Sequence, residues 1–242
     1  MIERLRRQVC YSAPVTGSFV GLLLGVAMGA RHALDPDHLA AVSVLAADDP
    51  GPRRGAVLGA LWGVGHAAAL MGTGVVLAAL AAELPAALAD AFELAVAAML
   101  ILLGARALVR ALRSADAGPA REHVHAGVPH RHAGPTAHVH VARRTVALRP
   151  LAVGVVHGLA GSGALTALVL ARLPSAHLRF TYMALFSAGS IVGMCALSGL
   201  AGWPLARLAR NPRASRLLMG TIGAASAALG LLWAWPVAGR LF

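Results

Sequence analysis

The sequence predicts an all-α protein that crosses a membrane several times. Hydrophobic residues fill 58% of its 242 positions, charged residues only 13%, and the mean hydropathy is +0.70. Soluble domains carry about 25% charged residues. The formal charge of +11 comes from arginines, and these flank apolar segments as membrane anchors do. We therefore expect the lipid bilayer as a partner and no nucleic acid.

Six segments approach the roughly 20 apolar residues that cross a bilayer. The breaks between them combine Pro or Gly with polar residues, as in "ADDPGPRR" and "AELP". The expected spans are 15–46, 55–82, 88–110, 148–171, 178–201 and 215–236.

The arginines predict the orientation of these spans. Fourteen belong to the side that holds the loops after spans one, three and five, six belong to the other side, and Arg31 lies within the first span. Because arginine is enriched on the cytoplasmic side, we expect both termini outside and the long polar loop inside the cell.

Three short motifs recur about 125 residues later. "RHALDPDHL" resembles "VHGLAGSGAL", which aligns His32 with His157 at an offset of 125. "LWGVGHAAALMG" resembles "LFSAGSIVGMCALSG", which aligns His66 with Ser190 at 124, and "LILLGARAL" resembles "AALGLLWAW" at 126. The alternative is a bias toward Ala, Gly and Leu, which produces single matches by chance. Three nearly equal offsets favour an internal repeat.

An internal repeat of three spans would turn its second copy upside down. Inverted repeats are typical of secondary transporters, which bind their substrate near the bilayer midplane between the two copies. We expect one repeat over 1–113, a His-rich mobile cytoplasmic loop over 114–147, and the second repeat over 148–242.

The segment "RHALDPDHLAA" places charge within the first span. Arg31, Asp35 and Asp37 would together oppose membrane insertion by about 9 kcal/mol, so pairing or a bound ion must compensate. Pro36 lacks a backbone N–H and disturbs the preceding helical turn. We therefore expect a first helix that is broken near Pro36 and lines a polar cavity.

His32, Asp37 and His38 in this segment offer nitrogen and oxygen donors but no thiolate, which suits Ni, Co, Cu(II) or Zn better than Cu(I). On a regular helix the two histidines would point about 120° apart, so only the break could bring them together. The other histidines in predicted spans are His66 and His157. The alternative is that the histidines are ordinary buried hydrogen-bonding groups and the aspartates pair with the arginine.

The long polar loop carries "EHVHAGVPHRHAGPTAHVH", a tract that is typical of mobile metal capture. A solubilising spacer or a pH-responsive patch are the alternatives. Its histidines are His123, His125, His130, His132, His138 and His140.

Enzyme motifs are missing from the sequence. Without lysine no phosphate-binding loop can form, no H-E-x-x-H lies in a span, and the serine in "HGLAGSGA" lacks a strand–turn–helix context. We therefore expect no enzymatic activity.

"RHALDPDHLAAV" resembles the signature of the nickel/cobalt transporter superfamily (NiCoT/NicO), whose hallmark is H-x4-D-H in an early transmembrane helix. "LWGVGHAAALMG" is similar to the second, Gly-His motif of the family. "VHGLAGSGALTAL" looks like a segment of its six-span branch, often labelled urease accessory protein or nickel permease. The resemblance implies that His32, Asp37, His38 and His66 select and carry the metal, and less directly that His157 does.

Two departures from the family pattern stand out. Larger members begin with an additional span, and Asp35-Pro36 replaces the common Asp-Ala. Supporting roles are expected for Arg31, Asp35, Ser162 and Ser190.

We expect uptake of Ni2+ or Co2+ across the inner (plasma) membrane of a bacterium, with the ion as substrate and no prosthetic group. A divalent cation gains about 4.6 kcal/mol per 100 mV on moving to a negative interior. The alternatives are efflux by proton exchange, or a membrane metal sensor or delivery subunit that serves a nickel-enzyme maturation partner.

Overall fold

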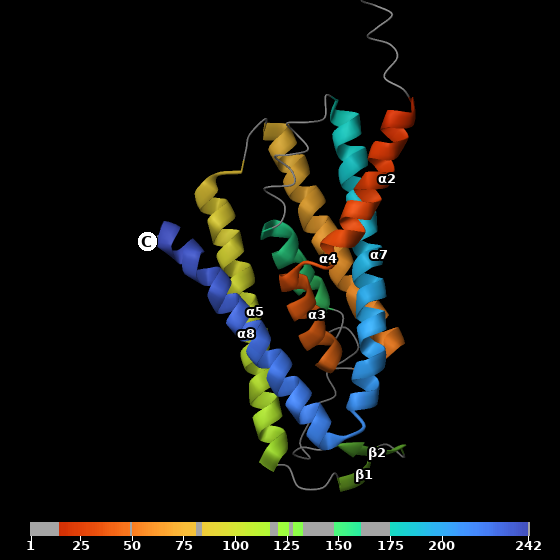
Figure 1. Cartoon of the computed structure of the whole chain (residues 1–242), viewed down its shortest axis with the longest axis vertical. Coiled ribbons are helices and arrows are strands. Elements are labelled where there is room, and N and C mark those ends of the chain that lie inside the picture. Colours follow the sequence, from red (N-terminus) through yellow and green to blue (C-terminus); the bar gives the residue numbers. More distant parts are fainter. Residues whose placement is uncertain are drawn as a thin grey trace, which may run out of the picture.

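The computed structural model describes residues 15–48, 50–80, 84–116, 121–125, 128–132, 148–160 and 175–241. These residues form seven helices and one β-hairpin (Figure 1). The first half contains α2 (Val15–His32), α3 (Pro36–Asp48), α4 (Pro52–Leu80) and α5 (Ala86–Asp116). Antiparallel strands β1 (Arg121–His125) and β2 (Val128–His132) follow. The second half contains an unlabelled helix (Leu148–Ala160), α7 (Ala176–Leu208) and α8 (Pro212–Leu241).

Four of the described helices are long and apolar enough to cross a membrane: Pro52–Leu77, Ala86–Arg113, Ala176–Leu208 and Pro212–Arg240. The chain is therefore a multi-pass, helical membrane protein. The small hairpin is the one departure from an all-α fold in the part that is described, and it lies within the segment predicted to be a loop.

The last two helices run farther than the predicted spans, which ended at 201 and 236. α7 continues through Pro204 and α8 through Pro236. A proline inside a helix removes a single backbone hydrogen bond, and packing can offset that loss. In α7, Gly202 and Leu205 are buried on either side of the proline.

The first helix is broken near Pro36, as predicted. α2 ends at His32 and α3 begins at Pro36. The N–H of Asp35 donates to the carbonyl of His32 at 3.1 Å, which satisfies the acceptor that the break would leave free. Proline suits the first position of α3 because its missing N–H would have no partner within the helix.

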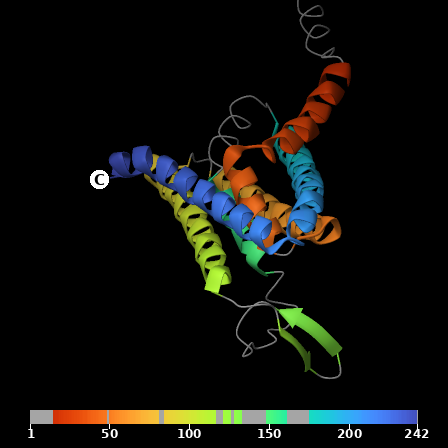
Figure 2. The same cartoon turned by 60° about the horizontal axis from the view of Figure 1, so that its bottom comes forward.

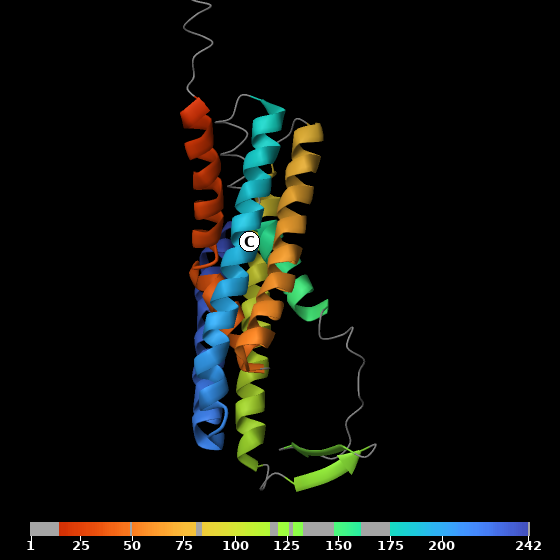
Figure 3. The same cartoon turned by 90° about the vertical axis from the view of Figure 1, so that its right-hand side faces the viewer.

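α3 lies in the centre of the bundle (Figures 1 and 3). It contacts α4, α5, α7 and α8, while α4 packs along α7 and α5 packs along α8. Figure 2 shows α8 crossing α5 on one side of α3. The largest buried apolar cluster joins α3 to its neighbours and includes Val42, Trp62, Leu100 and Met194.

Four helix pairs cross so closely that glycine is required at the contact. A Cβ on any of these glycines would come closer than 3.0 Å to a backbone carbonyl oxygen of the other helix. Small residues permit such approaches between membrane helices. The contacts are Gly29 to Phe186 and Gly189 to Val26 (α2 with α7), Gly154 to Trp62 and Gly65 to Leu151 (the Leu148–Ala160 helix with α4), Gly55 to Ser198 and Gly59 to Met194 (α4 with α7), and Gly104 to Gly223 and Gly230 to Ala97 (α5 with α8).

Arginines gather where α5 and α7 end and α8 begins, at the lower end of Figure 1, where the hairpin also lies. They are Arg110, Arg113, Arg207, Arg210, Arg213 and Arg216.

Candidate metal site

Four helices bring four histidines and an aspartate to one place. His32 is the last residue of α2, Asp37 and His38 lie in the first turn of α3, His66 is in α4, and His157 is in the Leu148–Ala160 helix. Three of the histidines are at most 2% exposed, namely His38, His66 and His157. The donors predicted from the sequence therefore converge, and they come from both halves of the chain.

The rings of these histidines are close neighbours. The ring centroids of His32 and His38 are 4.5 Å apart, and His66 lies 5.1 and 5.4 Å from them. The ring centroid of His157 lies 4.8 Å from that of His38. The break between α2 and α3 thus achieves the convergence that a regular helix would prevent.

Three histidines use Nδ1 for a hydrogen bond. His32 contacts a carboxylate oxygen of Asp35 at 2.6 Å, and His38 contacts one of Asp37 at 3.0 Å. His157 contacts the carbonyl one helical turn earlier at 3.2 Å. When Nδ1–H donates to oxygen, the neutral ring keeps its lone pair on Nε2. The same arrangement orients histidines that bind metals.

Several buried nitrogens have no hydrogen-bond partner among the described residues. They are Nε2 of His38, Nε2 of His157, both ring nitrogens of His66 and the indole Nε1 of Trp62, which is a donor only. A buried polar atom without a partner costs about 1–3 kcal/mol. The alternative of ordinary, satisfied core histidines therefore fits the cluster poorly, whereas a cation fits the lone pairs it offers.

The donors form two overlapping sets. One contains His32, His38 and His66, and the other contains Asp37, His38 and His157, with the ligand atoms of each set within 4.8 Å of one another. In the second set, Nε2 of His157 lies 3.6 Å from Asp37 Oδ2. His38 belongs to both sets.

A cavity of about 360 Å³ lies beside the cluster. His32 and three acidic residues, Asp35, Asp37 and Glu93, contribute to its lining. The side chain of His32 is 22% exposed and that of Asp37 is 16% exposed. The cavity thus gives a cation a polar approach to a site that is otherwise buried.

Glu93 and Trp62 also border the site, although neither is among the site residues predicted from the sequence. Glu93 is an acidic residue inside a predicted span, a signal that should have marked it. The ring of Trp62 lies 5.2 Å from His38 and 5.5 Å from His157. It precedes His66 by one helical turn, so the two side chains share a helix face.

The supporting residues have different surroundings. Arg31 is exposed, and in the described ranges no ion pair joins it to Asp35. Ser190 is fully buried and donates to the carbonyl of Gly29 at 3.2 Å, so it holds the crossing of α2 and α7. Ser162 lies outside the described residues.

The His-rich loop is described only in part. β1 pairs with β2 in antiparallel register, and His123 stands opposite His130. His125 and His132 lie at the strand ends. His138 and His140 fall outside the described ranges.

Comparison with known proteins agrees with this geometry. The chain is 26% identical over 210 residues to a urease accessory protein, UreH, from Bacillus sp. (strain TB-90), which covers 87% of this chain and 88% of the relative. No solved structure matches the chain. The profile of the NicO family, described as high-affinity nickel-transport protein, matches residues 19–209. The chain therefore belongs to the NicO family, which is a family of transporters and not of enzymes.

Proposed function

We propose that this protein carries Ni2+ across the membrane and binds the ion through His32, Asp37, His38, His66 and His157. One observation carries the proposal: buried imidazole nitrogens that have no hydrogen-bond partner among the described residues converge at the broken helix. Nitrogen and oxygen donors suit Ni2+, and they accept Co2+ as a second substrate.

The two donor sets support a stepwise path for the ion. Both sets reach the cavity, the first through His32 and the second through Asp37. The side chain of His32 is the more exposed of the two, at 22% against 16%, so the set that contains it receives the ion first. His38 belongs to both sets, so it stays bound to the ion while the ion moves on to Asp37 and His157. An ion that changes partners one at a time never has to regain its full hydration shell within the membrane.

The close helix crossings support two inverted repeats. Gly29 contacts Phe186, and Gly154 contacts Trp62. The two glycines are 125 residues apart and their partners are 124 apart, so the second contact repeats the first with the halves exchanged. The crossing of α5 and α8 shows the same exchange, because Gly104 contacts Gly223 and Gly230 contacts Ala97. The two glycines that make these contacts are 126 residues apart, and so are their two partners. Inverted repeats that rock about a central site provide alternating access.

We assign the repeats to 1–113 and 148–242 and place the arginine-rich end, with the loop 114–147, in the cytoplasm of a bacterial cell. Both termini then lie outside. The membrane potential favours uptake, and the loop histidines would capture metal that arrives inside. The name of the UreH relative supports a further partner, a protein that matures a nickel enzyme.

Accumulation of isotopic Ni2+ and Co2+ in cells that express the chain alone tests this function. Wild type should accumulate nickel, and His38→Ala and His66→Ala should not. The matched control is His177→Ala, because His177 is exposed at the start of α7. A fall in cellular metal would instead indicate an exporter, and no change a sensor or delivery subunit. Wild-type uptake by His38→Ala would reject the site.

A further inference from the structure

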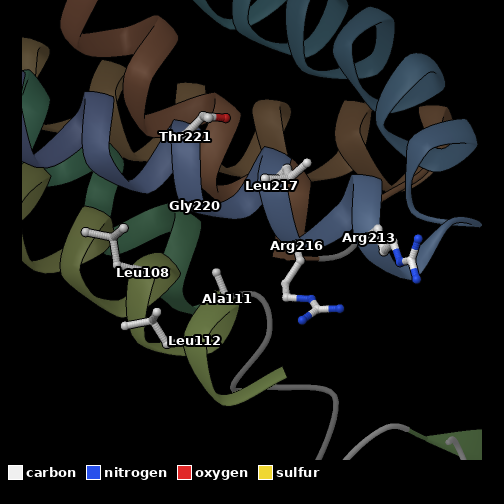
Figure 4. A pocket seen from close by; sticks show the side chains of 8 residues that line it. All are labelled: Leu108, Ala111, Leu112, Arg213, Arg216, Leu217, Gly220 and Thr221. Carbon is white, nitrogen blue, oxygen red and sulfur yellow. The ribbon is translucent and has the colours of Figure 1, made fainter. Parts of the chain in front are cut away.

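A second cavity, of about 590 Å³, opens between the end of α5 and the start of α8 (Figure 4). It is separate from the histidine cluster and shares no lining residue with the cavity beside that cluster. Its walls are mostly apolar, formed on α5 by Leu108, Ala111 and Leu112 and on α8 by Leu217, Gly220 and Thr221.

Two arginines complete this cavity. Figure 4 shows Arg213 and Arg216 at one end, while Leu108 and Leu112 lie at the other. Within the part of the chain that the structure describes, no carboxylate pairs with either guanidinium. The backbone at the start of α8 is already capped, because Asn211 Oδ1 accepts from the N–H of Arg213 at 3.0 Å. An anion would therefore be bound by the side chains and not by the helix end.

Gly220 keeps the apolar wall open. A Cβ added at Gly220 would meet only Ala111, at 3.9 Å. This glycine is not required by a tight crossing, unlike Gly223 one turn later. Its lack of a side chain leaves room for an apolar chain from elsewhere.

We propose that this groove binds one anionic phospholipid. Its phosphate lies between Arg213 and Arg216, and an acyl chain runs past Gly220 toward Leu108. Both helices span the membrane, so the groove faces lipid, and its cations lie where the spans end and headgroups begin. Guanidinium groups bind phosphate oxygens in pairs, and basic pockets between membrane helices favour anionic headgroups.

The combination of charge and apolar wall selects the occupant. Free phosphate would use the arginines and leave the leucine wall without a partner. A second copy of this chain would have to bring an acidic group to the arginines, and the few acidic residues of the chain make a lipid headgroup the better match.

The test measures lipids that stay bound to the purified full chain by native mass spectrometry. The protein is titrated with phosphatidylglycerol or phosphatidylcholine of identical acyl chains, with inorganic phosphate as a competitor. Wild type should retain phosphatidylglycerol preferentially. The double variant Arg213→Gln/Arg216→Gln should bind it about thirtyfold more weakly, at about fivefold for each arginine near the headgroups. Arg210→Gln, an exposed arginine at the same end, is the matched control and should bind normally.

A second variant tests the acyl-chain wall. Gly220→Phe fills the groove and leaves both arginines in place, so it should also lose phosphatidylglycerol. Gly239→Phe is its control, because Gly239 lies on the same helix and a Cβ there would meet nothing within 4 Å. Equal binding of both lipids, displacement by millimolar phosphate, or full binding by Gly220→Phe would each overturn the proposal. Loss of a dimer in Gly220→Phe with lipid binding intact would assign the groove to a second copy instead.

Discussion

Replacing His66 by leucine should make the metal-free protein more stable and the nickel-bound protein less so. His66 is 1% exposed, and neither ring nitrogen has a hydrogen-bond partner among the described residues. Each such atom costs about 1–3 kcal/mol. An apolar side chain of similar size removes both costs. Allowing for imperfect packing, we expect the metal-free protein to gain about 2 kcal/mol, which raises the apparent Tm by roughly 5 °C.

The same variant loses one metal ligand. Nickel at a hundred times its Kd stabilises a binding protein by about 2.7 kcal/mol, and the His66→Leu protein should lose most of that gain. Thermal unfolding in detergent, with and without Ni2+, measures both effects, with His177→Leu as the exposed control. If His66→Leu lowers the metal-free Tm and still responds to nickel as wild type does, the ring is a structural group and the reasoning fails.

Three further predictions concern the scaffold, the cavity and protons. Gly29→Ala and Gly154→Ala should each lower the free energy of unfolding by at least about 1–3 kcal/mol, because the added methyl group overpacks a helix crossing. Gly72→Ala, with open space around it, should be tolerated, and equal apparent Tm values for all three variants would contradict the close crossings. Glu93→Gln should raise the KM for Ni2+ about fivefold with little change in maximal rate, because a carboxylate at the cavity concentrates cations. Asp90→Asn, outside the lining of the cavity, serves as control, and an unchanged KM for Glu93→Gln would count against a role of Glu93 in access of the ion. Nickel uptake should decline as external pH falls from about 7.5 to 5, because protons compete for imidazole nitrogen; a flat profile would mean that these rings do not bind the ion.

Much of the helical architecture could be predicted because its causes are local. Apolar length predicts a span whatever surrounds it, and Pro36 predicts a break because it affects its own helical turn. The ends of α7 and α8 were misjudged for the opposite reason. Whether a helix continues past Pro204 or Pro236 depends on packing against other helices, which the local sequence does not reveal.

The site followed the same division. His32, Asp37 and His38 stood out because ionisable residues in a span are costly. The arrangement of the two donor sets depends on how α4 and the Leu148–Ala160 helix pack against α3, and no local pattern contains that information. The hairpin was missed because its strands are only five residues long and rich in histidine and arginine, which carry little β-propensity.

In the proposed arrangement of two inverted repeats, the helix crossings repeat but the metal-binding residues do not. Ser190 stands where the repeat would place a counterpart of His66, and it serves a helix crossing. The set of His32, His38 and His66 therefore lies within the first of the proposed repeats, whereas the set that contains His157 would join residues of both. A motion that separates the Leu148–Ala160 helix from α3 would leave the first set intact and open the second. Under the proposed function, the ion would then be released because it loses His157.

Distances between spin labels test this consequence. Leu39 on α3, Val57 on α4 and Leu148 on the short helix are all exposed and can carry labels once Cys10 and Cys195 are replaced. The distance from Leu39 to Leu148 should change between nickel-loaded and nickel-free protein, because it joins α3 to the short helix that carries His157. The distance from Leu39 to Val57 should stay constant, because α3 and α4 hold the first donor set. If both distances change by the same amount, release does not depend on a separate movement of the short helix.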